Sequence, residues 1–415
     1  MQSQTNLQKH LVIYFQVHQP LRLANFRFFD IGSGKPYLND SLNQDILERI
    51  ARECYLPTNM LLLKLIKNYP QIKLVFSVSG LALDQMEEYT PEVLASFRAL
   101  AQTGAVEFLA ETQYHSLACM IPGDEFEQQV IDHAKKLQRL LGVKPKSFRN
   151  TELIYSDDIG RRVHALGFKA VFCDGLEKIL GTQSPHHLYQ HPDKDLHLLL
   201  RNYRLSDDIA FRFKQGNELL TVQKYISWLD NIPENETLVT LALDYETFGE
   251  HQKRATGILS FLEDLLVNLA HHPVYRMATS TEVIRKEKVK SRLSVPVLVS
   301  WADRERDLSA WLGNVIQQDA FDTLLSLEHK VKALEDKELL TRWRTLQTSD
   351  HFYYMSTKKD DDGNVHAYFS PYPSPYEAFI NYMNILSDFT LEVNKRLNAI
   401  PTRKQAEIET AQSMM

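Results

Sequence analysis

SFRNTELIYSDDIGRRVHALGFKAVFCD, residues 147–174, contains two short apolar strands on either side of one helix. The predicted strands are 147–151 and 170–174. The helix between them, 156–167, opens with Ser and acidic residues and ends at Gly, which is common at helix ends. Two strands joined through a helix run parallel in the same sheet. This stretch therefore predicts one strand–helix–strand unit of a parallel sheet.

The same alternation extends through the first two thirds of the chain. Further apolar strands are predicted at 11–17, 73–78, 105–112, 196–202 and 238–244. Amphipathic helices are predicted between them at 59–69, 91–104 and 126–142. Near-continuous apolar strands are typical of a parallel sheet that is buried on both faces. Because seven such strands follow in order and no GxGxxG follows any of them, the pattern favours an incomplete (β/α)7 barrel over an open dinucleotide-binding sheet.

The pattern changes after about residue 285, where the charged stretch RKEKVKSRLS is followed mostly by helical periodicity. We predict an α/β protein with a barrel domain over 1–288 and a helical C-terminal region over 289–400, packed on the barrel. The stretch KKDDDGNVHAY, 358–368, is predicted to be an exposed turn. The polar residues 401–415 are predicted to be a frayed tail.

Composition excludes several classes of protein. A formal net charge of −6 argues against a nucleic-acid-binding protein, which needs a basic face. The first ten residues are polar, unlike a secretory signal, and no apolar run is long enough to span a membrane. The three cysteines are widely spaced, which predicts neither a disulfide framework nor a zinc knuckle. A cytoplasmic enzyme without nucleic-acid or membrane partners is expected.

Polar side chains gather at the predicted strand ends, where barrel enzymes carry their active sites. The first strand ends in VHQP, the third in ETQYHS and the seventh in LDYETFGEH, while the fourth runs into FRNTELIY. The ionisable and amide groups that these ends supply are His18, Gln19, Glu111, His115, Arg149, Glu152, Asp244 and Glu246. A row of such groups at the ends of apolar strands is typical of an enzyme site.

Two carboxylates in this set, Glu152 and Asp244, each end a buried strand, and function most easily explains their desolvation cost. A facing pair of carboxylates suits glycoside hydrolysis. Arg149 and Asn150 would keep Glu152 ionised, and Glu246 would raise the pKa of Asp244 by like-charge repulsion. Structural roles are the alternatives for single residues, namely an ion pair of Glu152 with a nearby arginine or a helix N-cap at Asp244.

A metal site is the main competitor within enzymes. The stretch PHHLYQHPDKDLH, 185–197, is rich in histidine but has no HExxH or paired-cysteine spacing, and it is predicted to be a hairpin loop. The first strand ends in HQP rather than in a His-x-Asp that would hold a metal. Metal-dependent hydrolysis or deacetylation is therefore the weaker interpretation, and neither a metal nor another cofactor is expected.

Taken together, the motifs resemble glycoside hydrolase family 57, particularly its α-amylase-type members. The similarity runs from about residue 10 to about residue 390. The motifs that carry it are VHQP, SGLALDQ (79–85), FRNTELIY (148–155), LDYETFGEH (243–251), WADRERDLSAWLGN (301–314) and LQTSDHFYYM (346–355). Asp84 in the second motif stands where the family pattern has Glu.

The resemblance implies a retaining hydrolase of α-1,4-linked glucans, with Glu152 as nucleophile, Asp244 as general acid/base and no cofactor. It also implies a helical bundle after the barrel. The expected substrate-binding residues are His18, Gln19, Glu111, His115, Arg149, Glu246, Trp301, Asp303, Trp311, Asp350 and His351. A role as a buried core anchor is an equal alternative for the two tryptophans.

Other functions remain compatible with the motifs. A 4-α-glucanotransferase or branching-type transferase would form the same intermediate and pass the glycosyl group to a sugar hydroxyl instead of water. A non-catalytic glucan-binding relative is the alternative outside enzymes, and the presence of both carboxylates argues against it. The sequence does not specify chain-length preference, α-1,4 against α-1,6 linkage or oligomeric state.

Overall fold

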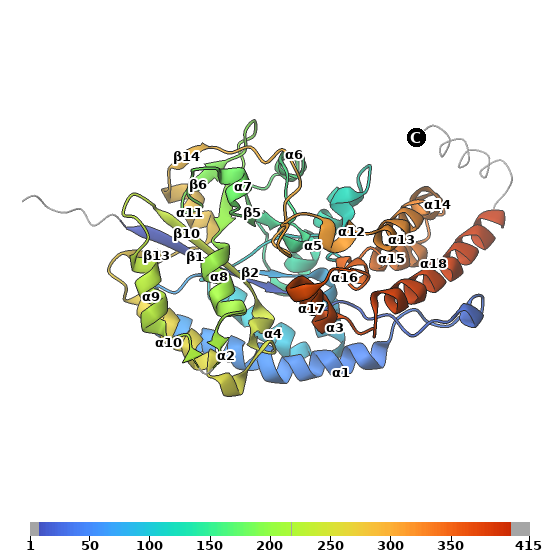
Figure 1. Ribbon diagram of the computed structural model, residues 1–415, viewed down its shortest axis with the longest axis horizontal. Coiled ribbons are helices and arrows are strands. Elements are labelled where there is room, and N and C mark those ends of the chain that lie inside the picture. The colour runs from blue at the N-terminus through green and yellow to red at the C-terminus, as the bar shows by residue number, and fades with distance from the viewer. Residues whose placement is uncertain (1–7, 217, 400–415) are drawn as a thin grey trace, which may run out of the picture. The chain divides into compact units, whose positions relative to one another are not determined.

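The computed structural model describes residues 8–216 and 218–399 (Figure 1). The predicted tail, 401–415, lies outside the described residues. The chain divides into two compact units. The barrel unit comprises residues 8–19, 44–113 and 126–301, and the helical unit comprises 20–43, 114–125 and 302–399.

Each of the seven predicted strands is present in the barrel unit, because long apolar runs rich in branched and aromatic residues form buried strands. They are β1 Lys9–Val17, β2 Leu74–Val78, β3 Val106–Phe108, β4 Ser147–Arg149, β5 Ala170–Asp174, β7 His197–Arg201 and β10 Leu238–Asp244. Parallel ladders join β10, β1, β2 and β3 in that order. Parallel ladders also join β4 to β5 and β5 to β7.

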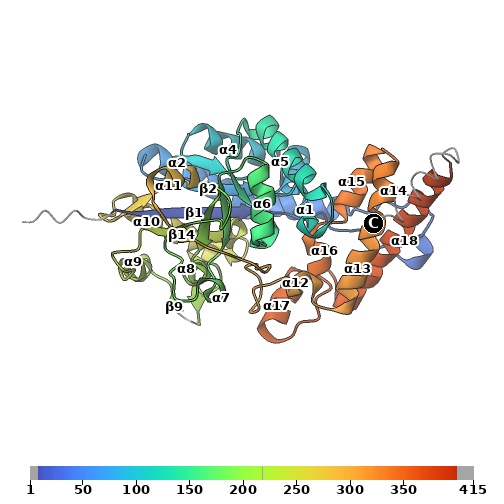
Figure 2. The same ribbon diagram turned by 90° about the horizontal axis from the view of Figure 1, so that it is seen from above.

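Two narrow joints close these strands into a ring. A parallel bridge between Ala110 and Phe148 links the third strand to the fourth. A single pair, Thr240 with Arg201, links β10 to β7. Figure 2 shows helices α2 and α4 on one side of β1 and α8 and α9 on the other. The described residues therefore form the predicted incomplete (β/α)7 barrel.

Four predicted helices are confirmed as α2 Leu56–Asn68, α4 Pro91–Gln102, α5 Glu125–Leu141 and α6 Asp157–Ala165. The predicted cap of α6 is present, since the Ser156 side chain accepts a hydrogen bond from the backbone N–H of Ile159. The other helices that begin or lie in this part of the chain are α1 Asp40–Ile50, α3 Gly80–Tyr89, α7 Glu177–Leu180, α8 Tyr203–Ala210, α9 Val222–Asp230, α10 Ile258–Ala270 and α11 Ser280–Lys286.

Short strands escaped the sequence analysis. β6 Leu188–Gln190 pairs antiparallel with β7, so the histidine-rich stretch is a hairpin, as predicted. β14 Val289–Arg292 pairs with β6 and lies in the charged stretch RKEKVKSRLS. β13 Tyr275–Met277 pairs with the start of β1. These short strands are defined mainly by their pairing with other strands, which explains why they were missed.

Side chains alternate along β1 between two apolar clusters. Leu11, Ile13, Phe15 and Val17 belong to the larger cluster, which includes the buried faces of the surrounding helices. Val12 and Tyr14 belong to the smaller cluster inside the ring. Full burial of each such side chain stabilises the fold by roughly 1.5–3 kcal/mol. The next inward-facing position after Tyr14 is Gln16, so the interior becomes polar at the carboxyl ends of the strands.

The helical unit is built from short helices and the 24-residue helix α18 around a core that includes Trp311, Trp343, Phe352 and Tyr382. Its helices are α12 Ser309–Leu312, α13 Val315–Leu325, α14 Glu328–Ala333, α15 Lys337–Thr345, α16 Ser349–Tyr353, α17 Asp360–Phe369 and α18 Pro375–Asn398. Within residues 8–216 and 218–399, no helix combines the length and apolar character that crossing a membrane requires.

The predicted exposed turn over 358–368 is wrong, because most of it forms α17. Three aspartates occupy the first turn of this helix, where negative charge is favourable. Near its other end His366 is buried and stacks on the ring of Tyr353 with the centroids 3.7 Å apart. Helix-end electrostatics and this tertiary contact outweigh the turn-like composition.

The domain boundary also differs from the predicted one at 288–289. The barrel unit continues to residue 301, and two loops that follow barrel strands belong to the helical unit. In the first loop, Phe26 N–H donates to Asn381 Oδ1 at 2.6 Å. In the second, Ser116 forms a bridge with Thr348. These contacts join residues that are far apart in the chain. Local composition therefore could not predict that the two loops belong to the helical unit.

Candidate active site

The carboxyl ends of the barrel strands carry a layer of polar side chains. Strand register pairs Gln16 of β1 with Ser77 of β2 and with Asp244 of β10. It also pairs Asp174 of β5 with Arg201 of β7. Each of these residues lies two positions after a residue of the smaller apolar cluster inside the ring. Its side chain therefore also faces the interior of the ring. The sequence expectation of polar groups at strand ends is met here.

Glu152 sits on a strained turn directly after β4. The backbone φ is 56° at Glu152 and 51° at Leu153, in the left-handed region that non-glycine residues seldom adopt. Such conformations cost of order 1–3 kcal/mol each and persist only where the surroundings hold them. Trp301 supplies two hydrogen bonds: its indole Nε1–H donates to Glu152 Oε2 at 2.7 Å and its backbone N–H donates to Glu152 O at 3.2 Å. The carboxylate is thereby held in one orientation.

Arg149 connects the two predicted catalytic carboxylates electrostatically. Its side chain is fully buried. Burial alone would lower its pKa, but the opposing attraction of Tyr14, Glu111, Glu152 and Asp244 prevails and raises the pKa. Since one guanidinium responds to the charges of both Glu152 and Asp244, the two carboxylates belong to one charged region.

Glu111 is enclosed rather than open to solvent. Its carboxylate accepts hydrogen bonds from Ser77 Oγ at 2.7 Å and from Gln16 Nε2 at 3.3 Å. The other oxygen lies 3.3 Å from Arg149 Nη1, and the side chains of both residues have no exposed surface. This burial fits a role in holding Arg149 better than the predicted contact with substrate.

Asp244 ends β10, and its side chain makes no capping hydrogen bond to the turn that follows. The structure therefore does not support the helix-cap alternative. Arg201, which is nearly buried, lies 2.5 Å from Asp207 and 3.5 Å from Asp174. Burial lowers its pKa, but these aspartates and Asp244 outweigh burial and raise it. Asp244 thus lies within the influence of a second buried guanidinium.

Glu246 is a buried carboxyl beside Asp244. Burial, followed by the negative charge of Asp244, raises its pKa to about 8, so the group is mostly protonated at neutral pH. Its Oε1 accepts hydrogen bonds from the Tyr55 hydroxyl and, at 3.2 Å, from the backbone N–H of His18. His18 is placed in turn by Ser79, whose Oγ is 2.8 Å from His18 Nδ1. The raised pKa belongs to Glu246, whereas the sequence predicted a raised pKa for Asp244.

Two further predicted residues have structural contacts in the barrel unit. Gln19 is buried, and its backbone oxygen accepts a hydrogen bond from Gln85 Nε2 at 2.8 Å. Asp84, the departure from the family pattern, places both carboxylate oxygens 2.5 Å from Lys136 Nζ. We conclude that Asp84 pairs helices α3 and α5.

The remaining predicted substrate-binding residues lie in the helical unit: His115, Asp303, Trp311, Asp350 and His351. Trp311 is buried in the core, in agreement with the alternative role as an anchor. Asp303 Oδ2 lies 2.7 Å from Lys358 Nζ and 3.0 Å from His366 Nε2. His115 has a φ of 47° and its backbone oxygen accepts a hydrogen bond from Ser349 N–H at 3.0 Å. These contacts tie the predicted residues to their own unit.

The sequence analysis missed the contributions of Arg201 and Tyr55 to the site. Arg201 was not among the predicted site residues, although it lies two positions after Leu199 of the smaller apolar cluster and faces the interior of the ring. Tyr55 had no usable signal, because it lies at the end of a π-helical turn, Ala51–Tyr55, within a helical stretch. Its contact with Glu246 joins residues 191 positions apart.

The described residues contain one cluster with cation-like spacing, Asp303, Glu305 and Asp362. Lys358 and His366 already contact carboxylates of this cluster, so we assign no metal to it. In the histidine-rich hairpin, ring nitrogens of His186 and His191 have protein partners. His186 bonds Glu236, and His191 Nε2 lies 2.8 Å from Asp157 O.

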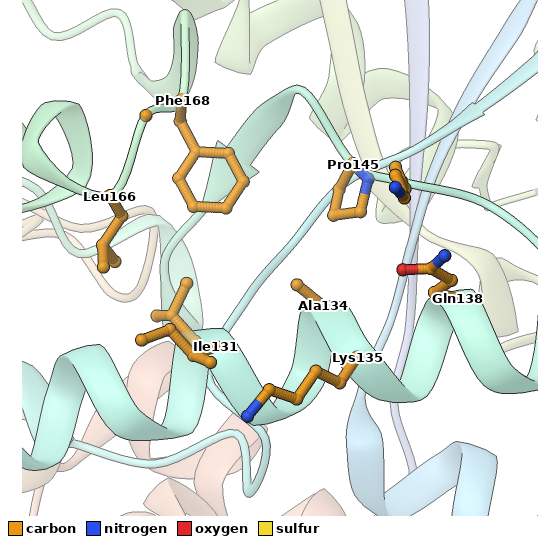
Figure 3. A pocket seen from close by; sticks show the side chains of 10 residues that line it. Ile131, Ala134, Lys135, Gln138, Pro145, Leu166 and Phe168 are labelled. Carbon is orange, nitrogen blue, oxygen red and sulfur yellow. The ribbon is translucent and has the colours of Figure 1, made fainter.

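A pocket of about 290 Å³ lies elsewhere on the barrel unit, between α5 and the connection from α6 to β5 (Figure 3). Ile131, Ala134 and Phe168 form its apolar wall, and Lys135 and Gln138 lie at its edge. No carboxylate lines it, and none of the predicted site residues belongs to it. This pocket is therefore not the candidate active site.

Comparison with known proteins supports the interpretation of the strand-end layer. A family model described as "Glycosyl hydrolase family 57" matches residues 12–296. A Methanocaldococcus jannaschii protein named "Putative alpha-amylase" is 40% identical over 399 residues, which cover 92% of this chain and 84% of that protein.

Solved structures share the fold. A branching enzyme from Thermococcus kodakaraensis has a TM-score of 0.71 at 14% identity, covering 97% of this chain and 94% of that one. A 4-α-glucanotransferase from Thermococcus litoralis has a TM-score of 0.63 at 16% identity over 83% of this chain, which spans only 56% of that protein. At these identities the structural likeness speaks for the fold alone. The family model, which matches nearly the whole barrel, and the 40% identical relative decide the affiliation, and the chain belongs to glycosyl hydrolase family 57.

Proposed function

We propose that this protein is a retaining hydrolase of α-1,4-linked glucans, of α-amylase type, with Glu152 as nucleophile and Asp244 as general acid/base. The observation that carries the proposal is the position of these two carboxylates at the carboxyl ends of barrel strands, where both act on the fully buried Arg149. Membership of a glycosyl hydrolase family and the 40% identical relative with an α-amylase name support the substrate class.

The reaction proceeds in two displacements at the anomeric carbon. In the first, protonated Asp244 gives its proton to the glycosidic oxygen while that oxygen leaves C1, and a carboxylate oxygen of Glu152 bonds to C1. In the second, Asp244 takes a proton from water, whose oxygen bonds to C1 while the bond to Glu152 breaks. Both carboxyl groups return to their starting states. This chemistry requires the two carboxyl groups to lie roughly 5–5.5 Å apart.

Neighbouring charges support these roles. Arg149 and Arg201 supply buried positive charge next to the carboxylates, which favours an ionised nucleophile before attack and after release. Glu246, with a pKa of about 8, is mostly neutral at neutral pH. It therefore fills the space beside Asp244 without adding a full negative charge there.

A glucan transferase is the second candidate, because the same pair of carboxylates can serve either reaction. It would use the same covalent intermediate, with a sugar hydroxyl in place of water in the second displacement.

Incubation with purified maltooligosaccharides tests both candidates. We expect wild-type protein to release one new reducing end for each bond cleaved and to make only shorter products. Glu152→Gln is expected to lose at least about 1,000-fold in kcat, as nucleophile removal generally does. Glu92→Gln, an exposed change on the surface of α4, is the matched control and should keep wild-type activity.

The outcomes are distinct. If Glu152→Gln cleaves glucan as fast as wild type, the nucleophile assignment is wrong. Products longer than the starting oligosaccharide, without a matching rise in reducing ends, would replace hydrolysis by transfer. If wild-type protein leaves every α-glucan unchanged, the proposed activity is wrong.

A further inference from the structure

Trp301 and Glu152 are joined by two hydrogen bonds, although 149 positions separate them in the chain. The indole Nε1–H donates to Glu152 Oε2 at 2.7 Å, and the backbone N–H of Trp301 donates to the backbone oxygen of Glu152 at 3.2 Å. The first bond acts on the carboxylate itself, and the second acts on the strained turn that carries it.

The indole is itself fixed in place. Two residues before it, Val299 exchanges both backbone hydrogen bonds with Tyr155 at 2.9 Å, which anchors the segment next to the Glu152 turn. The guanidinium carbons of Arg149 and Arg201 each lie 5.4 Å from the centre of the indole ring. Cations at this distance from an aromatic face attract it. The ring therefore has a defined orientation before any substrate binds.

We infer that Trp301 is a positioning residue of the reaction, which orients the Glu152 carboxylate through its indole N–H and stabilises the negative charge there. This inference rests on the proposed function, in which Glu152 is the nucleophile. The carboxylate is charged before attack, neutral as the glycosyl ester and charged again on release. A hydrogen-bond donor to this carboxylate makes it a better leaving group when the glycosyl ester breaks in the second displacement.

The inference differs from the role expected from the sequence, where Trp301 only binds substrate. A stacking platform would affect the affinity for sugar and leave the ionisation of the nucleophile unchanged. A donor to the carboxylate would affect turnover and pH dependence. Arg149 and Arg201 are the charged groups at the indole ring. Tyr14, Glu111 and Asp244 act together with Glu152 on Arg149.

Trp301→Phe tests the inference, because it keeps an aromatic ring and removes the N–H. We expect kcat on maltooligosaccharides to fall about 10- to 100-fold, the range for a hydrogen bond to an ionised group. KM should not rise, because release of the glycosyl group becomes slower. The acid limb of kcat/KM should move to higher pH, because the ionised carboxylate has lost a donor.

Trp228→Phe is the matched control. Trp228 lies on α9, with Lys224 Nζ 5.6 Å and the Tyr225 ring 6.0 Å from its ring. The same loss of an indole there should leave kcat, KM and the acid limb at wild-type values. Urea unfolding of both variants verifies that each is folded under the assay conditions.

A fluorescence titration without substrate separates this inference from the proposed function. We expect a pH-dependent step in tryptophan emission of wild-type protein that is absent from both Trp301→Phe and Glu152→Gln. If this step is seen but no glucan is cleaved, the proposed function fails and the contact stands. If Trp301→Phe keeps the wild-type acid limb, or loses no more turnover than Trp228→Phe, Trp301 is not a positioning residue.

Discussion

Glu246 is a buried carboxyl group next to Asp244, the proposed general acid/base. It lies two residues after Asp244, and its pKa is raised from 4.5 to about 8 by burial and by the charge of Asp244. Hydrogen bonds from Tyr55 and from the backbone of His18 hold the group in position in spite of this cost. Glu246 therefore affects both the electrostatics around Asp244 and the pH dependence of the stability of the fold.

Glu246→Gln tests this link through the pH dependence of stability. Between about pH 4.5 and 8 the folded state binds more protons at Glu246 than the unfolded state, so stability falls as pH rises through this window. Glutamine is neutral throughout and keeps the oxygen that accepts both hydrogen bonds. We expect the variant to gain stability over wild type as pH rises, by at most about 1.4 kcal/mol per pH unit. Urea unfolding at pH 5, 6.5 and 8 measures the difference.

Glu250→Gln is the matched control with the opposite sign. Burial raises the pKa of Glu250, but hydrogen bonds from Arg49 and Lys253 outweigh burial and lower it. Its ionised form therefore stabilises the folded state fully above about pH 4.5, so the amide should be less stable than wild type by a constant amount between pH 5 and 8. If Glu246→Gln also differs from wild type by a constant amount over this range, the proposed protonation of Glu246 is wrong.

At the scale of elements, the π-helical turn Ala51–Tyr55 delivers Tyr55 to the site. It lies against the short strand β11, Phe248–Gly249, that follows the Asp244 motif. Gly249 has a φ of 131°, and a side-chain Cβ there would lie 2.2 Å from the backbone oxygen of Glu53. Only glycine permits this approach, so the π-helical turn can pack closely on β11 because Gly249 has no side chain.

Gly249→Ala is therefore expected to destabilise the protein by about 2–5 kcal/mol, which combines the cost of the backbone conformation with overpacking. Gly257→Ala serves as control, because its φ of 85° is also left-handed but no atom lies within 4 Å of the new Cβ. It should cost only about 1–2 kcal/mol. Urea midpoints of the two variants provide the comparison, and equal losses would contradict the steric argument.

At the scale of the whole molecule, the barrel strands and the helical unit are connected through loops as well as through the chain end. The loop 114–125, which follows β3, belongs to the helical unit and ends at Glu125. Glu125 is fully buried and forms two hydrogen bonds with Arg344 of α15, at 2.8 and 3.1 Å. A fragment ending at the predicted boundary of 288 would leave this carboxylate buried without its main partner.

Arg344→Met should consequently destabilise the protein by about 3–5 kcal/mol, because it leaves the buried carboxylate of Glu125 without its main partner. The double variant Glu125→Gln with Arg344→Met removes that charge and should recover part of the loss. Arg304→Met is the control, since its ion pair with Asp361 is largely exposed and should change stability by less than about 1 kcal/mol. Thermal unfolding of the three proteins measures the effect. Failure of the double variant to improve on the single one would refute the buried-charge explanation.

Local patterns, namely apolar runs, helix caps and alternation along a strand, predict the seven barrel strands, the principal helices and the polar strand ends. Asp244 ends β10 as predicted, and Glu152 lies on the turn that follows β4. The strained turn at Glu152 was not apparent, because a positive φ in a residue with a side chain has no pattern of its own.

The distant residues that contact these carboxylates are set by tertiary packing. Trp301 reaches Glu152 across 149 positions and Tyr55 reaches Glu246 across 191, while α17 and the short strands β6, β13 and β14 depend on contacts beyond their own sequence. Such contacts arise from how the elements pack. A short stretch of sequence indicates its own secondary structure and which of its faces is apolar. It does not indicate which other segment of the chain will pack on that face.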